Sequence, residues 1–180
     1  MRSLRTGLSL AALVTGAALL FTAPAAHAAD TPLRDLAAAK GKVIGTAVTG
    51  SKLFVADPGA GKVVRFTIGA YDLEWGEFPG AGVLDTPTGL AIDAAGDIYV
   101  TNKNQNLIQK FASDGTYLTS FGGSGVTLLS NPSAIAVGPT GNIYVADTGN
   151  HRIEVFSNTG TYLDRWGSFG SGAGQMTSPS

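Results

Sequence analysis

The side chains with the most evident chemistry in this sequence recur at the ends of short apolar runs. Asp57, Asn102 and Asp147 lie 45 residues apart, and each ends a run rich in β-branched and aromatic residues. An oxygen in such a position accepts backbone N–H groups of the turn that follows. A calcium site would need several such oxygens converging on one point, which the sequence does not show. We therefore predict turn-capping roles, with no bound metal or other cofactor.

The sequence gives little support for a metal or catalytic site built on histidine or cysteine. The chain has no cysteine, and of its two histidines His27 lies in an N-terminal leader, so His151 stands alone in the mature protein. A lone histidine makes a poor metal site, and its position in a repeat predicts a structural role. A His-Glu-x-x-His zinc motif, a nucleophile elbow and a Walker phosphate loop are all absent from the sequence. We predict no catalytic residues and favour a function other than catalysis.

The elements that carry these residues form an internal repeat. Residues 131–166 hold four short apolar runs separated by Gly, Asn, Asp and Pro, which favour turns. Such a pattern predicts four antiparallel strands. Tyr144 in this unit is preceded 45 residues earlier by Tyr99, and Tyr99 by Phe54 at the same distance. Four strands per unit at this period are typical of propeller blades.

We therefore predict an all-β fold of about three blades, each of four antiparallel strands. The units are expected at about residues 42–86, 87–131 and 132–178. Trp75 and Trp166 fall at the ends of the fourth strands of the first and third units. We predict that both tryptophans pack between neighbouring blades and do not serve as platforms for sugars.

The repeat resembles the NHL repeat family over residues 53–180. The resemblance is strongest at residues 141–147 and at Asn150-His151-Arg152, the trio from which the family takes its name. In the middle unit Asn102 replaces the aspartate of this pattern, and the first unit keeps only residues 53–57. The resemblance implies part of a six-bladed propeller that acts as a binding platform. Related propellers include lactonases and amidating lyases, so an enzyme is the alternative, because a fold does not fix a function.

A ligand of such a platform would bind on the face formed by the turns between second and third strands. The ligand could be a protein, a small molecule or a carbohydrate. The candidate residues on this face are Asp57, Asn102, Lys103, Asn104, Asp147, His151 and Arg152.

The N-terminus has the pattern of an export signal. Arg2 and Arg5 precede the 14-residue apolar run Leu8–Phe21, which is too short to span a membrane. We predict a signal peptide over residues 1–28, a mature N-terminus at Ala29, and a secreted, extracellular protein without a membrane anchor. Cleavage lowers the count of basic residues from 12 to 10 against 13 acidic ones, which argues against a nucleic-acid partner.

Residues 29–52 are predicted to form a short helix followed by a linker or leading strand. Thr31 can cap this helix and Pro32 suits its first position. The stretch 32–53 also resembles the mature start of family-10 endo-xylanases. Those enzymes are TIM barrels, which need about 250 residues. A xylanase-derived leader fused to a propeller and a chance helix are the two alternatives.

Three blades alone would leave two broad apolar faces uncovered, and such faces mark interfaces. Pro179 resembles the start of a fourth unit. Two expectations follow: the sequence is a truncated piece of a longer product, or two copies form a homodimer that closes a six-bladed ring.

Overall fold

The computed structural model describes residues 45–67, 70–76, 82–125 and 128–180, which form three four-stranded antiparallel sheets. The first sheet contains β1 (Gly45–Thr49), β2 (Lys52–Asp57), β3 (Lys62–Thr67) and β4 (Ala70–Trp75). The second contains β5 (Pro87–Ile92), β6 (Ile98–Asn102), β7 (Leu107–Phe111) and β8 (Tyr117–Phe121). The third contains β9 (Ile135–Val137), β10 (Ile143–Asp147), β11 (Arg152–Phe156) and β12 (Tyr162–Trp166), with a 3-10 turn, η2 (Thr148–Asn150), between β10 and β11.

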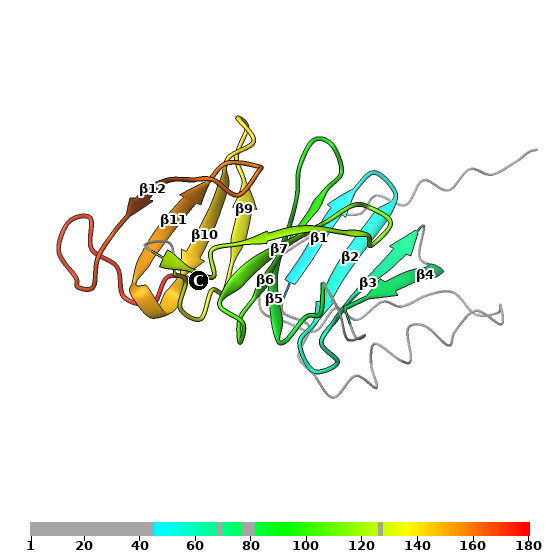
Figure 1. Cartoon of the computed structure of the whole chain (residues 1–180), viewed down its shortest axis with the longest axis horizontal. Helices are drawn as coiled ribbons and strands as arrows, with labels where there is room; N and C mark the ends of the chain where they lie inside the picture. Colours follow the sequence, from blue (N-terminus) through cyan, green and yellow to red (C-terminus); the bar gives the residue numbers. More distant parts are fainter. Residues whose placement is uncertain (1–44, 68–69, 77–81, 126–127) are drawn as a thin grey trace, which may run out of the picture.

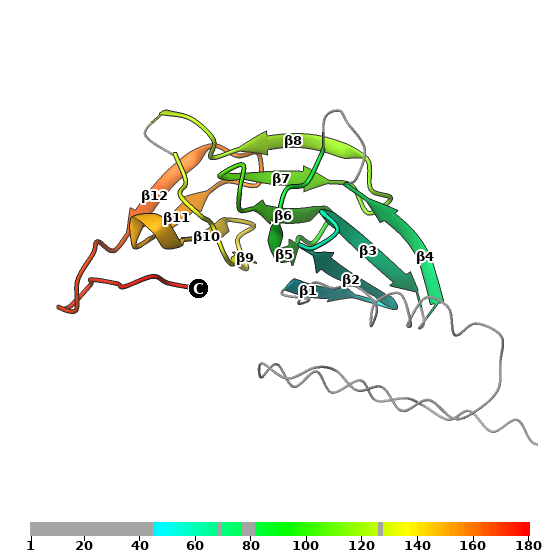
Figure 2. The ribbon, with the colours of Figure 1, turned by 90° about the horizontal axis from the view of Figure 1, so that it is seen from below.

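Within each sheet the strands are hydrogen-bonded in sequence order, so each sheet is a simple meander. The three sheets stand side by side like the ribs of a fan (Figures 1 and 2). Figure 2 shows β1, β5 and β9 along the inside of the arc and β4, β8 and β12 along its outside. This radial arrangement of four-stranded sheets is that of β-propeller blades. The predicted all-β fold is confirmed, and we refer to the sheets as the first, second and third blades.

The second blade lies between the other two, and its burial follows from that position. All of β6 is buried, because neighbouring sheets cover both of its faces. This explains why Ile98–Thr101 is a continuous run of β-formers and does not alternate apolar with polar residues.

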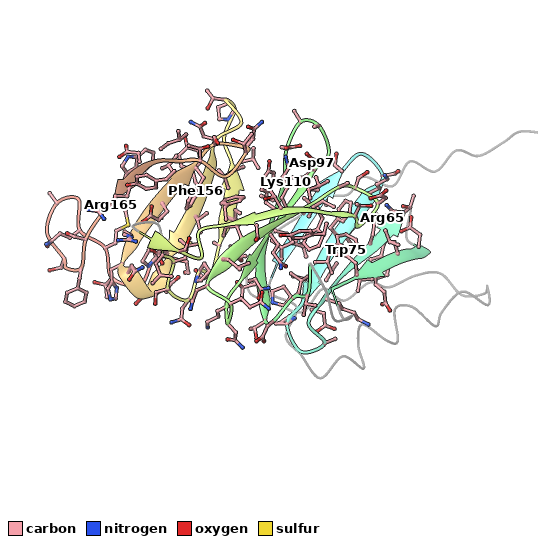
Figure 3. The ribbon with its side chains drawn as sticks, in the orientation of Figure 1. Arg65, Trp75, Asp97, Lys110, Phe156 and Arg165 are labelled. Carbon is pink, nitrogen blue, oxygen red and sulfur yellow. The ribbon has the colours of Figure 1, made fainter. Side chains whose placement is uncertain are left out.

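An aromatic cluster joins the first blade to the second. The ring of Trp75, labelled in Figure 3, is at its centre. Its centroid lies 6.0 Å from that of Phe54 and 5.9 Å from that of Phe111. Gly115, in the β7–β8 turn, lies beneath the indole, where a Cβ would come within 3.2 Å of the Trp75 ring. The prediction that Trp75 packs between blades is confirmed.

The second and third blades meet through a cluster of the same design. Phe121 occupies the place of Trp75, and its ring lies 5.1 Å from that of Phe156. Gly160, in the β11–β12 turn, again lies beneath the aromatic ring, where a Cβ would come within 2.7 Å of Phe121. Gly160 also has φ +85°, so the turn requires glycine on two counts.

The prediction for Trp166 is wrong. Its side chain is 49% exposed, and its ring contacts that of Tyr144 at 5.5 Å in its own blade. The reason is geometric: Trp166 points to the side of the third blade where no further sheet exists among the residues that the structure describes.

The N-terminal predictions fall mostly outside the described residues. These are the signal peptide over residues 1–28, the helix over residues 31–40 and most of the stretch that resembles xylanases. Strand β1 begins at Gly45 and pairs with β2, so the first blade has its own leading strand. Among the described residues, no helix is long and apolar enough to span a membrane.

Candidate binding site

The turns β2–β3, β6–β7 and β10–β11 lie at the same end of their sheets, which is the lower edge in Figure 1. The meander dictates this, because the second and third strands of every blade run in equivalent directions. All seven candidate residues lie in these turns or at the strand ends that flank them.

In the second blade, Asn102 holds the connector that leads into its own blade. Its side chain is fully buried, its Oδ1 accepts the N–H of Asp85 at 2.9 Å, and its Nδ2 donates to the carbonyl of Val83 at 3.2 Å. Gln109 on β7 donates to the same carbonyl at 3.1 Å. Asn102 therefore fixes the backbone of the connector at Val83 and Asp85.

In the third blade, Asp147 performs the same task with more partners. The carboxylate is fully buried; Oδ1 accepts the N–H of Ser130 at 2.6 Å, while Oδ2 accepts from Asn150 Nδ2 at 2.7 Å and from Arg152 Nε at 2.9 Å. Asn150 in turn donates to the carbonyl of Leu128 at 3.0 Å. The trio that suggested the NHL family thus fixes the connector before β9 to the β10–β11 turn.

His151 holds the connector that leaves its blade. Its backbone is left-handed, with φ +57°, and its Nδ1 accepts the N–H of Ser178 at 3.1 Å. Asn106, 45 residues earlier, has φ +56°, and its Oδ1 accepts the N–H of Asn131 at 2.8 Å. The two residues are structural counterparts, which supports a structural role for the histidine.

Asp57 caps the β2–β3 turn of the first blade. Its Oδ1 accepts the N–H groups of Gly59 and Ala60, each at 3.0 Å, and only 6% of the residue is exposed. This is the capping role that the sequence predicts for an aspartate at the end of a second strand.

Sequence reasoning missed Glu154, which is fully buried on β11. Arg152 Nε lies 2.7 Å from Glu154 Oε1 and 2.9 Å from Asp147 Oδ2, so one guanidinium serves two buried carboxylates. Burial raises the pKa of Glu154, and the charge of Arg152 only partly opposes this. Gln109 occupies the same register position in β7. The position of Glu154 as a charged residue inside the apolar run Ile153–Phe156 is the feature of the sequence that could have revealed it.

A hollow of about 330 Å³ opens beside the β6–β7 turn, on the inner side of the fan. Its walls come from the innermost strand β5, from the residues that lead into β9, from the β6–β7 turn and from the last residue of the chain. The lining residues are Thr88, Lys103, Ser133, Ala134 and Ser180.

Two of the three hydroxyl groups of this lining, those of Thr88 and Ser133, are held by backbone carbonyls of later segments of the chain. Thr88 Oγ1 donates to the carbonyl of Pro132 at 3.1 Å, and Ser133 Oγ donates to the carbonyl of Pro179 at 3.3 Å. Thr88 and Ser133 each follow a proline and lie 45 residues apart, so the repeat alignment could have revealed them.

Lys103 is the cationic group of the hollow. Its backbone N–H donates to the carbonyl of Thr86 at 3.1 Å, which fixes the turn, while its ammonium makes no salt bridge with any described residue. The neighbouring Asn104 is exposed, and its Nδ2 donates to Asp85 Oδ1 and Thr86 Oγ1, each at 2.9 Å. A lysine ammonium among hydroxyl groups suits an anionic or hydroxylated group.

The structure therefore divides the seven predicted residues into two sets. Lys103 and Asn104 present side chains at the surface of the β6–β7 turn. The other five hold loops in place: Asp57, Asn102, Asp147, His151 and Arg152. Within the described part of the chain, no three histidine, cysteine, aspartate or glutamate side chains are grouped so as to hold a metal ion.

Residues 84–111 and 129–156 match the family model described as "NHL repeat". The second and third blades thus each contain one match to this repeat. Each match begins in the connector that Asn102 or Asp147 holds and ends with the third strand of its blade, so it covers the clamped connector together with three strands. A search of curated proteins finds no match.

Solved structures show the same fold in proteins of different function. A streptogramin B lyase is 24% identical, with a TM-score of 0.59 over 70% of this chain and 40% of the lyase. A chain of a nidogen/laminin complex is 25% identical, with a TM-score of 0.57 over 68% of this chain and 46% of that one. The WD40 repeats of RRP9 are 17% identical, with a TM-score of 0.59 over 73% of this chain and 39% of that one. The chain thus spans less than half the length of each of these structures.

Proposed function

We propose that this NHL-repeat chain is a binding module that takes an anionic or hydroxylated group of its ligand into the hollow beside Lys103. The observation that carries the proposal is the position of a lysine ammonium without a salt-bridge partner among the described residues, at a hollow whose other polar side chains carry hydroxyl groups.

The size of the hollow limits what enters it. Small-molecule sites span about 300 to 1,000 Å³, and this hollow, at about 330 Å³, lies at the lower end of that range. One side chain of a protein or one sugar unit fits such a volume. The rest of a larger ligand would then lie across the neighbouring turns, where Asn104 is exposed.

The buried clamps support this assignment, because they make the surrounding backbone rigid. Asn102 and Asp147 hold the connectors on either side of the second blade to the β6–β7 and β10–β11 turns. A surface that is ordered before binding loses less conformational entropy when the ligand arrives. Asn102 and Asp147, which the sequence predicts as ligand contacts, thus favour binding by ordering the backbone around the hollow.

An array of acidic and neutral glycans and peptides tests the proposal. We expect binders to concentrate among acidic members, and binding to fall at least about tenfold in Lys103→Ala, a loss of about 1.4 kcal/mol. Lys52→Ala is the charge-matched control, because Lys52 begins β2 at the opposite end of the first blade. Equal losses in both variants would show a non-specific charge effect and refute the site.

An enzyme remains the second candidate, and the observation in its favour is the fold shared with streptogramin B lyase. Another solved lyase of this kind, from Staphylococcus aureus, is described with quinupristin. Incubation of purified protein with quinupristin and divalent cations, followed by chromatography, tests this candidate. Consumption of quinupristin would favour the enzyme, and unchanged quinupristin would exclude that activity.

A further inference from the structure

The hydroxyl proton of Thr88, in the wall of the hollow, is already used inside the protein. Thr88 Oγ1 donates to the carbonyl of Pro132 at 3.1 Å and lies 2.9 Å from Thr101 Oγ1. A hydroxyl group has one proton and two lone pairs. Because a carbonyl can only accept, the proton of Thr88 belongs to that bond, and Thr101 is the donor between the two threonines. Thr88 therefore offers a ligand a lone pair and no proton.

Ser133, in the opposite wall, is in the same state. Its Oγ lies 2.6 Å from Thr148 Oγ1 and 3.3 Å from the carbonyl of Pro179, and Thr148 Oγ1 lies 2.7 Å from that carbonyl. Ser133 donates either to the carbonyl or to Thr148, which then donates to the carbonyl. Both arrangements use the proton of Ser133, so this hydroxyl group also offers the hollow only a lone pair.

Lys103 has the complementary property. Its ammonium group has three N–H donors and no acceptor, and it makes no salt bridge with any described residue. A ligand that fits the hollow therefore accepts hydrogen bonds from Lys103 and donates them to Thr88 and Ser133. A group that does only one of these leaves polar atoms of the wall unpaired, which weakens binding.

Simple anions and simple cations each fail this requirement. A carboxylate, a sulfate or a fully ionised phosphate has only acceptors to offer, so beside Thr88 it would place one lone pair against another. An ammonium group donates, but it would bring a second positive charge into a hollow of about 330 Å³ that Lys103 already lines. Hydroxyl groups donate without adding charge. The best fit is therefore a compact group that combines an anion with several hydroxyl groups.

We propose that the unit bound in the hollow is an acidic sugar, with its anionic group at Lys103 and with ring hydroxyl groups that donate to Thr88 and Ser133. This inference rests on the proposed function and narrows it to one class of ligand. The described lining residues include no aromatic side chain, so recognition depends on these hydrogen bonds and not on stacking against the sugar ring.

Calorimetric titration of the full chain with a panel of oligosaccharides tests the ligand class. The panel contains uronate, sialylated and sulfated oligosaccharides, a neutral counterpart of each, and a glutamate oligomer that matches their charge but has no hydroxyl groups. We expect at least one acidic sugar to bind at least about tenfold more tightly than both its neutral counterpart and the glutamate oligomer. Lys103→Ala should remove this preference for the acidic sugar over its neutral counterpart.

Ser133→Ala tests the hydroxyl acceptors without releasing the backbone, because the carbonyl of Pro179 keeps Thr148 as a donor. Loss of one acceptor should weaken the binding of the acidic sugar about threefold to tenfold. Ser120→Ala is the matched control, since Ser120 is exposed on the outer strand β8, and this variant should bind as the wild type does. Equal affinities of the two variants would refute the hydrogen bond to Ser133.

Two results separate a failure of this inference from a failure of the binding site. A glutamate oligomer that binds as tightly as every acidic sugar, and loses its binding in Lys103→Ala, would refute the acidic sugar and leave the site beside Lys103 in place. Absence of any Lys103-dependent binding across the panel would refute both the sugar and the site.

Discussion

Replacement of Trp75 by alanine should remove the centre of the contact between the first and second blades. The side chain is 9% exposed and lies between the rings of Phe54 and Phe111. Truncation of a buried tryptophan to alanine costs about 3–5 kcal/mol. Trp75 Nε1, however, is buried without a hydrogen-bond partner among the described residues, and removal of such a donor returns about 1–3 kcal/mol. We therefore expect a net loss of about 2 kcal/mol in the free energy of unfolding, the difference between the mid-range values of about 4 and about 2 kcal/mol.

Urea unfolding followed by far-ultraviolet circular dichroism measures this loss without relying on tryptophan fluorescence. Trp75→Phe should lose less than Trp75→Ala, because phenylalanine keeps a ring and has no N–H group to bury. Leu118→Ala is the control for an apolar side chain on an outer strand, since Leu118 is 46% exposed. A loss for Trp75→Ala within about 0.5 kcal/mol, the range of ordinary surface substitutions, would refute the reasoning that this indole joins two blades.

Three further predictions concern the buried charges and the N-terminus. Burial raises the pKa of Glu154 above its ordinary value of 4.5, so the folded chain holds this proton more tightly than the unfolded one. The free energy of unfolding of the wild type should therefore fall as the pH rises from about 4.5 through the folded-state pKa. Urea unfolding across a pH series measures this fall, and Glu154→Gln should reduce it. An equal fall in the variant would contradict the assignment to Glu154. Asp147→Ala should cost about 1–3 kcal/mol for each buried donor that it orphans, with faster hydrogen exchange at the amide of Ser130, and unchanged exchange there would disprove the clamp. Sequencing of protein from culture medium should give an N-terminus at Ala29, and a product that keeps Met1 would argue against export.

The local features of the blades could be predicted from the sequence because they depend on neighbours along the chain. Strand pairs and turns follow from runs of β-formers separated by Gly, Asn and Asp, and the cap at Asp57 follows from the turn chemistry of aspartate. Trp75 was placed correctly because the next blade is encoded immediately after it. The same reasoning failed for Trp166, since a repeat position fixes the direction of a side chain but does not supply the blade that should receive it.

The candidate site was harder to predict because one polar pattern serves two purposes. Asp147 and Arg152 have the residue types of a ligand site, yet their side chains hydrogen-bond to the backbone of the connector before β9. Only three-dimensional contacts reveal that the carboxylate of Asp147 is fully buried. Of the residues that line the hollow, only Lys103 was predicted from the sequence. Thr88 and Ser133 come from different blades and meet through the radial arrangement of the sheets.

Hydrogen–deuterium exchange with and without an acidic ligand selected from the array tests the central claim, that the hollow beside Lys103 is the binding site. The account predicts protection by the ligand in the β6–β7 turn, in β5 around Thr88 and in the segment before β9 around Ser133, with no change in the β5–β6 and β7–β8 turns at the opposite end of the second blade. Protection confined to those opposite turns, or a ligand footprint that persists unchanged in Lys103→Ala, would contradict the account.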